Sequence, residues 1–157
     1  MRVVRATARD AEQCLGIERS AVVAALQHVF PQNLYPFPEA IRADWHSAFL
    51  DSEVETFIAF QDDQAVGFVS VGHGFLRTLY VIPEAWSRGI GSTLHDLALD
   101  RLRSADVQEA RLWTLAGNHR ARAFYERRGW SLTGATRVVP FPPHPTDVEY
   151  ARSTLRT

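Results

Sequence analysis

The spacing of hydrophobic residues predicts alternating strands and helices along the chain. Apolar residues three and four positions apart indicate helices, and short apolar runs or strict alternation indicate strands. Helices are expected over 8–29, after Pro38 around apolar positions 41, 45, 48 and 49, and over 92–103 and 120–128. Strands are expected over 1–6, 53–60, 65–71, 76–82, 110–115, 133–139 and 148–155. This order predicts one α/β (α+β) domain, residues 1–157, built on a mixed sheet.

Several of these boundaries carry recognisable start or stop residues. Thr7 and Asp10 form a Thr-x-x-Asp pair of the kind that caps the first turn of a helix. Gly129 follows the helix expected over 120–128, in a position that favours glycine. Prolines at 31, 36 and 38 are expected to hold the segment 30–37 as a loop.

The segment 83–92 has the features of an anion-binding turn. It joins an expected strand to an expected helix, and Gly89 and Gly91 let a ligand approach the main chain closely. Successive N–H groups and a helix N-terminus attract a phosphate, and Arg88 adds positive charge. A Walker loop is excluded because the chain has no lysine, and a dinucleotide fingerprint needs a third glycine where Leu94 stands. A purely structural turn is the alternative.

A second block of chemically suggestive residues begins at Asn118, which follows the strand expected over 110–115. Asn118 can cap the next helix, and Ala121, Phe124 and Tyr125 then share one face of it. Both aromatic residues can be explained as core, an explanation that suits Phe124 best. The Tyr125 hydroxyl needs a polar partner when buried, so Tyr125 is also a functional candidate.

Composition narrows the classes of partner and compartment. The chain has 157 residues, a net charge of −1 and 46% hydrophobic residues, values typical of a globular domain. This charge balance gives no indication of nucleic acid or a membrane surface as a partner. Cys14 is alone, so neither an intrachain disulfide nor a cysteine-rich zinc site is expected, and no metal is expected as a cofactor. Without a visible signal peptide or a long apolar run, the expected location is the cytoplasm.

Together the two blocks resemble the GCN5-related N-acetyltransferase (GNAT) family. Residues 86–91, Trp-Ser-Arg-Gly-Ile-Gly, resemble the acyl-CoA motif Gln/Arg-x-x-Gly-x-Gly/Ala, with Trp86 at the usual Gln or Arg position. Residues 118–130 resemble the pattern Asn-x-x-Ala-x-x-Phe-Tyr-x-x-x-Gly-Phe/Trp. The resemblance implies a twisted, mostly antiparallel sheet of about seven strands flanked by about four helices. It also implies that strands 4 and 5 separate.

The resemblance further implies that acetyl-CoA lies between strands 4 and 5 and that a free amine attacks its thioester. The backbone of strand 4 would bind the pantetheine, and the turn would bind the pyrophosphate. The implied cofactor-binding residues are Leu79, Tyr80, Val81, Trp86, Ser87, Arg88, Gly89, Ile90, Gly91, Ser92, Asn118, Ala121, Phe124 and Tyr125.

Two proton transfers then need residues. Tyr125 suits the general acid because a phenol is protonated at neutral pH. Strand 4 offers Arg77 and Thr78 where many family members carry a glutamate, so the base is sought elsewhere. His73 has suitable chemistry, although an exposed turn histidine explains it as well. Weaker candidates for the base are His28, Asp44, His46 and Glu149, and Glu84 is expected to be a surface residue.

The acceptor is expected to be a small-molecule amine or a peptide N-terminus. In the family, acceptor contacts come from the first helical pair and the last strand pair, here the segments 28–37 and 140–145. The candidate acceptor residues are His28, Phe30, Tyr35, Trp45 and Phe141. These aromatic segments could equally form a homodimer contact. Two other functions stay open, a non-catalytic acyl-CoA-binding module and a Rossmann-like nucleotide enzyme.

Overall fold

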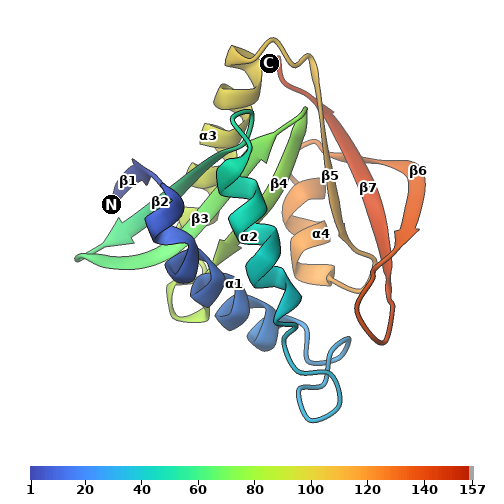
Figure 1. Cartoon of the computed structure of the whole chain (residues 1–157). Helices are drawn as coiled ribbons and strands as arrows, with labels where there is room; N and C mark the ends of the chain where they lie inside the picture. The colour runs from blue at the N-terminus through green and yellow to red at the C-terminus, as the bar shows by residue number, and fades with distance from the viewer. Residues whose placement is uncertain (156–157) are drawn as a thin grey trace.

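A seven-stranded sheet forms the centre of the molecule (Figure 1). The computed structural model describes residues 1–155. The strand order is β1-β2-β3-β4-β5-β7-β6, and every neighbouring pair except β4 and β5 is antiparallel. The strands are β1 (Arg2–Arg5), β2 (Glu55–Gln61), β3 (Gln64–Gly72), β4 (Phe75–Val81), β5 (Glu109–Leu115), β6 (Ser131–Val138) and β7 (Thr146–Ser153).

Four α-helices pack on this sheet. They are α1 (Ala11–Ala25), α2 (Ala40–Leu50), α3 (Ile90–Ser104) and α4 (His119–Glu126). Helices α1 and α2 contact each other and cover the near face of the sheet in Figure 1, while α3 covers the far face against β3 and β4. Seven strands and four helices in this order confirm the predicted fold class. None of the helices in the described part of the chain is long and apolar enough to cross a membrane.

The first helix is shorter than the predicted span 8–29 at both ends. Residues Ala8–Asp10 form a separate 3-10 turn, in which the Thr7 amide donates to Asp10 Oδ2 at 2.8 Å. At the other end α1 stops at Ala25, and the chain turns so that His28 Nε2 lies 2.7 Å from the carbonyl oxygen of Gly117. This contact with a loop distant in sequence is a tertiary effect that local periodicity does not contain.

The sheet opens between β4 and β5. These parallel strands share one paired position, Phe75 opposite Arg111, and beyond it the ladder is interrupted. The remaining backbone of β4 is therefore unpaired on its β5 side, and the two strands diverge toward the C-terminal end of β4. The split that the family resemblance implied is confirmed.

Candidate active site

A cavity of about 450 Å³ lies where β4 and β5 have separated. Four parts of the chain line it: the C-terminal half of α1, the end of β4, the turn into α3, and α4. The lining contains every residue predicted to bind the cofactor except Arg88. It also includes residues that the sequence had not indicated, namely Ala21, Val22, Ala25, Leu26, Ala85, Arg120, Arg127 and Arg128.

The turn before α3 presents free backbone N–H groups to this cavity. Gly89 is the N-cap of the helix, with a left-handed φ of 81°. Because glycine has no side chain, no side-chain group caps the first amides of the helix. Helix α3 therefore begins at Ile90, earlier than predicted, and its first-turn amides lack a side-chain acceptor. A Cβ on Gly91 would lie 3.4 Å from the Phe124 ring, so glycine keeps the passage between the turn and α4 open.

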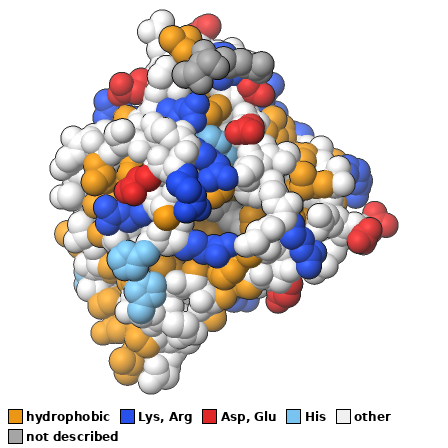
Figure 2. All heavy atoms as spheres, turned by 180° about the vertical axis from the view of Figure 1, so that it is seen from behind, with side chains coloured by type: hydrophobic (Ala, Val, Ile, Leu, Met, Phe, Trp, Pro, Cys, Tyr) orange, Lys and Arg blue, Asp and Glu red, His pale blue; other side chains and the backbone are white. Residues whose placement is uncertain are grey.

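Arginine side chains surround the mouth of the cavity. Arginines gather near the centre of the molecular face seen from behind (Figure 2). Arg128 lies 3.6 Å above the centroid of the Phe124 ring and donates to Ser92 Oγ at 2.5 Å. The Arg88 guanidinium instead lies 3.5 Å from Gln61 Oε1, outside the lining. The positive charge that the sequence assigned to Arg88 comes from α4 and the residues after it.

Trp86 closes one edge of the cavity. Its indole N–H donates to the Val81 carbonyl at 2.7 Å, and the Arg120 guanidinium lies 4.1 Å above its ring. The residue that departs from the family motif therefore joins the end of β4 to the start of α4. Because the Val81 carbonyl already accepts this bond, Leu79 is the better placed of the two for main-chain contact with a ligand.

Helix α4 contributes two polar groups of different kinds. Asn118 caps the helix by accepting from the Ala121 amide at 3.1 Å, which leaves its side-chain NH₂ available to the cavity. Tyr125 is buried, and its hydroxyl has no hydrogen-bond partner within residues 1–155. Burial raises the pKa of Tyr125, so the phenol stays protonated at neutral pH.

One helical turn before the α1 residues that line the cavity lies a buried carboxylate, Glu18, which does not line the cavity itself. Its Oε1 accepts from the Trp45 indole at 2.8 Å, and burial raises its pKa to about 7. Sequence reasoning missed this residue. The available signal was a charged side chain at a core-facing position of α1, on the same surface as Cys14 and Ala21.

Thr78 carries a hydroxyl on the same face of β4 as Tyr80. Thr56, Ser70 and Thr78 stand opposite one another on β2, β3 and β4. Thr56 Oγ1 donates to Ser70 Oγ at 3.1 Å, whereas Thr78 Oγ1 is buried with no partner anywhere in the described chain. A buried oxygen without a partner is costly, so Thr78 marks a position where a polar ligand or water would be accommodated.

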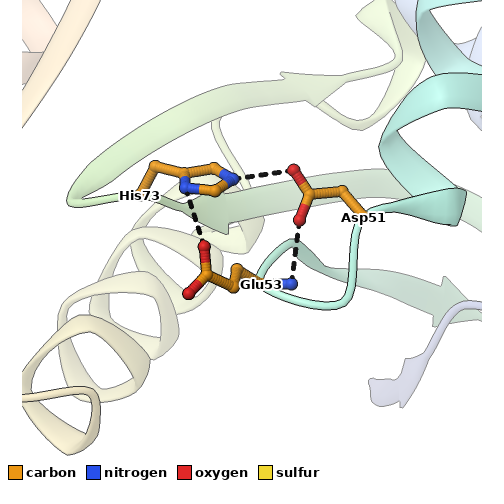
Figure 3. Close-up of side chains that lie close together, drawn as sticks. All are labelled: Asp51, Glu53 and His73. Atoms are coloured by element: carbon orange, nitrogen blue, oxygen red, sulfur yellow. Dashed lines mark hydrogen bonds and ion pairs between the residues drawn. The ribbon is translucent and has the colours of Figure 1, made fainter.

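The predicted base His73 lies elsewhere. It occupies the turn between β3 and β4, outside the cavity lining. Its Nε2 is 2.7 Å from Asp51 Oδ2 and its Nδ1 is 3.1 Å from Glu53 Oε2 (Figure 3). The bond from His73 lowers the pKa of Asp51. The ligand atoms of these three side chains are close enough together to hold a metal ion. Each carboxylate, however, contacts a different nitrogen of the His73 ring, which is the arrangement of a histidine held between two carboxylates.

The other candidates for the base are also outside the lining. Asp44 and His46 are exposed, and buried Glu149 accepts from Arg111 at 2.9 Å and from Thr133 at 2.8 Å. Glu84, expected to be a surface residue, is exposed.

The five candidate acceptor residues do not line the cavity either. Besides contacting Gly117, the His28 ring stacks on His119 with centroids 5.9 Å apart. Trp45 is a core residue that holds Glu18. The half-buried residues Phe30 and Tyr35 belong to a loop braced by Gln32, and Phe141 accepts from the His144 amide at 2.7 Å.

Comparisons with known proteins agree with this architecture. The sequence model of the acetyltransferase (GNAT) family matches residues 9–130. The chain is 28% identical over 125 residues to YafP, an uncharacterized N-acetyltransferase of Escherichia coli K12, and the match covers 80% of this chain and 77% of that protein. It is 43% identical over 58 residues to a mycothiol acetyltransferase of Beutenbergia cavernae, covering 37% of this chain and 20% of that protein.

Solved structures share the fold over nearly the full chain. A PaiA N-acetyltransferase of Thermoplasma acidophilum in complex with coenzyme A has a TM-score of 0.74 at 17% identity, covering 97% of this chain and 98% of that one. The ribosomal-protein-S18-alanine N-acetyltransferase of Escherichia coli has a TM-score of 0.73 at 20% identity, covering 99% of this chain and 95% of that one.

Proposed function

Because the chain belongs to the GNAT family of acetyltransferases, we propose that it transfers the acetyl group of acetyl-CoA to a primary amine. One observation carries the proposal. A turn with free amides and neighbouring arginines leads into a gap in the sheet, and the gap is lined by Tyr125, whose hydroxyl has no hydrogen-bond partner within residues 1–155.

The cavity residues suit the parts of acetyl-CoA in order. The amides of residues 89–92, with Arg120, Arg127 and Arg128 nearby, attract the pyrophosphate. The unpaired edge of β4 and the Asn118 NH₂ suit the amide groups of the pantetheine arm. This order brings the thioester toward Tyr125.

The chemistry then needs two proton movements. The acceptor ammonium loses a proton, and its nitrogen forms a bond to the acetyl carbonyl carbon. As the carbon–sulfur bond breaks, Tyr125 donates its hydroxyl proton to the departing thiolate. The new amide nitrogen releases its excess proton, which restores the Tyr125 phenol. The products are an N-acetyl amine, CoA with a free thiol, and one proton released to solvent.

The acceptor is proposed to be a small-molecule amine or a peptide N-terminus. The relatives and neighbours include enzymes named for mycothiol and for a ribosomal-protein alanine. The acceptors in these two names differ, one belonging to a small molecule and the other to a protein. They therefore support an amine acceptor in general and do not indicate one compound. A non-catalytic CoA-binding module is the second candidate, favoured only by the lack of a carboxylate on β4.

Ligand-dependent thermal unfolding tests the binding half of the proposal. CoA at about 100 times its dissociation constant should stabilise the protein by about 2.7 kcal/mol, whereas NAD and ATP at equal concentrations should stabilise it less. Equal stabilisation by all three would contradict a CoA-specific cavity. Absence of any stabilisation by CoA would contradict the proposed function itself.

A further inference from the structure

Glu18 is a buried carboxylate with too few partners for a permanent charge. It is 9% exposed, and the Trp45 indole is the one hydrogen-bond donor to it in the described part of the chain. An ionised carboxylate can accept about four hydrogen bonds, and burying it without them is costly. A residue of this kind is explained if a positively charged group reaches it during function.

Glu18 lies on the same face of α1 as the residues of this helix that line the cavity, although it is not a lining residue itself. Ala21, Val22 and Ala25 line the cavity, and they follow Glu18 by three, four and seven residues, which places all four on one helix face. Tyr80, on β4, connects the cavity with the surroundings of Glu18. It lines the cavity, and Glu18 and Tyr125 both lie close enough to its hydroxyl to raise its pKa further, after burial.

Side-chain packing also connects Glu18 to the cavity wall, because Trp45 donates to Glu18 and belongs to an aromatic cluster that includes Tyr80. The Tyr80 ring packs on Phe68 with centroids 5.8 Å apart, and Phe68 packs on Trp45 at 4.9 Å. Thr78, two residues before Tyr80, points to the same face, and its buried hydroxyl has no partner within residues 1–155. Tyr80 therefore joins the cavity wall to two buried polar groups, Glu18 and the Thr78 hydroxyl, which do not themselves line the cavity.

We propose that Glu18 binds the acceptor as an ammonium ion and takes its proton, directly or through one water. This inference rests on the proposed function and deepens it. In the step, the ammonium N–H bond breaks, the proton forms an O–H bond on the Glu18 carboxylate, and the neutral amine keeps its electron pair for attack on the thioester. Glu18 later releases the proton to solvent. Helix α1 thus supplies the carboxylate that β4 lacks.

The surroundings of Glu18 bring its pKa close to neutral pH. Burial raises its pKa to about 7, the bond from Trp45 lowers it, and the charge of Asp44 raises it. The other titratable groups that face it are Cys14 on α1 and Tyr80 on β4, and both are neutral at pH 7 because burial raises their pKa values. The kcat/KM of the wild-type enzyme should therefore fall on the acidic side of about pH 7.

Glu18→Gln is the principal test, because glutamine can still accept the Trp45 bond but cannot take a proton. At pH 7.5, with the best amine from a panel, its kcat/KM should fall by about 10²-fold or more while CoA affinity is unchanged. Glu12→Gln, on the exposed side of the same helix, is the matched control and should behave as wild type. A Glu18→Gln enzyme within threefold of wild type, with the same acidic limb, overturns the proposal and leaves the acetyltransferase intact.

Asp44→Asn gives a test that does not depend on a core substitution. Asp44 is exposed, and its charge raises the pKa of Glu18. Removing that charge should move the acidic limb of kcat/KM to lower pH while its plateau stays the same. A limb that does not move contradicts the assignment. If the wild-type enzyme itself releases no thiol with any amine while it binds CoA, the transferase function fails first, and the role of Glu18 fails with it.

Discussion

Burial changes the acidity of two side chains, Glu18 and Tyr125. Desolvation disfavours the charged form of an acid, so it raises the pKa of Glu18 to about 7 and raises that of Tyr125 as well. A carboxyl group whose pKa is close to 7 exchanges protons readily at neutral pH, and a phenol whose pKa is raised stays protonated there. The same physical effect therefore brings the Glu18 pKa close to neutral pH, as proton exchange requires, and keeps Tyr125 in the protonated form that a donor needs.

The raised pKa of Glu18 predicts a specific dependence of stability on pH. The folded protein holds this proton up to about pH 7, whereas the unfolded chain releases it near 4.5. Stability from this group is therefore fully present below pH 4.5 and is lost as the pH rises to about 7, by up to roughly 3 kcal/mol. Glu18→Gln should gain free energy of unfolding relative to wild type at pH 8 but not at pH 4.5, by urea denaturation. An equal difference at both values would contradict the burial argument.

At the scale of elements, the site depends on the junction of β4 with α3 and on the separation of β4 from β5. The turn leaves the first amides of α3 without a side-chain cap at the cavity because Gly89 adopts φ 81° and the helix starts at Ile90. The cavity exists because pairing between the two strands stops after Phe75. Neither feature alone would bind a long, anionic cofactor.

Two glycines allow the role of this turn to be separated from simple backbone strain. Gly89 and Gly74 both have positive φ, 81° and 84°, and a Cβ on either would meet nothing within 4 Å. Gly89→Ala and Gly74→Ala should each cost about 1–2 kcal/mol of stability. Calorimetric titration should show weaker CoA binding for Gly89→Ala alone. Equal CoA affinity in the two variants would argue against the turn as the anion site.

What the sequence could predict was mostly local. The Gly-x-Gly turn and the 118–130 block are contiguous, so their chemistry is visible in a single stretch of residues. The end of α1 at Ala25 and the position of Glu18 depend instead on contacts with Gly117 and Trp45, which are far away in sequence. The chemistry of His73 and its closeness to β4 in sequence favour it as a base, but it precedes the start of β4, whereas the cavity lies at the other end of that strand.

At the scale of the whole molecule, charge is distributed unevenly despite a net charge of −1. Arginines gather on the face seen in Figure 2. Arg120, Arg127 and Arg128 line the cavity, and Glu18 lies one helical turn before the α1 residues of the lining. The arginines suit an anionic cofactor, and Glu18 in its ionised form would suit a cationic acceptor. The chain has no lysine, so none of its own side chains offers an amine that competes with an added acceptor.

Amine-dependent release of free thiol from acetyl-CoA tests the central claim most directly. The panel should include aliphatic and aromatic amines and peptides with different N-terminal residues, with Tyr125→Phe assayed beside the wild type. We predict thiol release by the wild type that requires an amine and equals the N-acetyl product by mass spectrometry, with turnover about 10²-fold lower in Tyr125→Phe. If the protein binds CoA but releases thiol no faster with any amine than without one, the cavity is a binding site and the account of an N-acetyltransferase is contradicted.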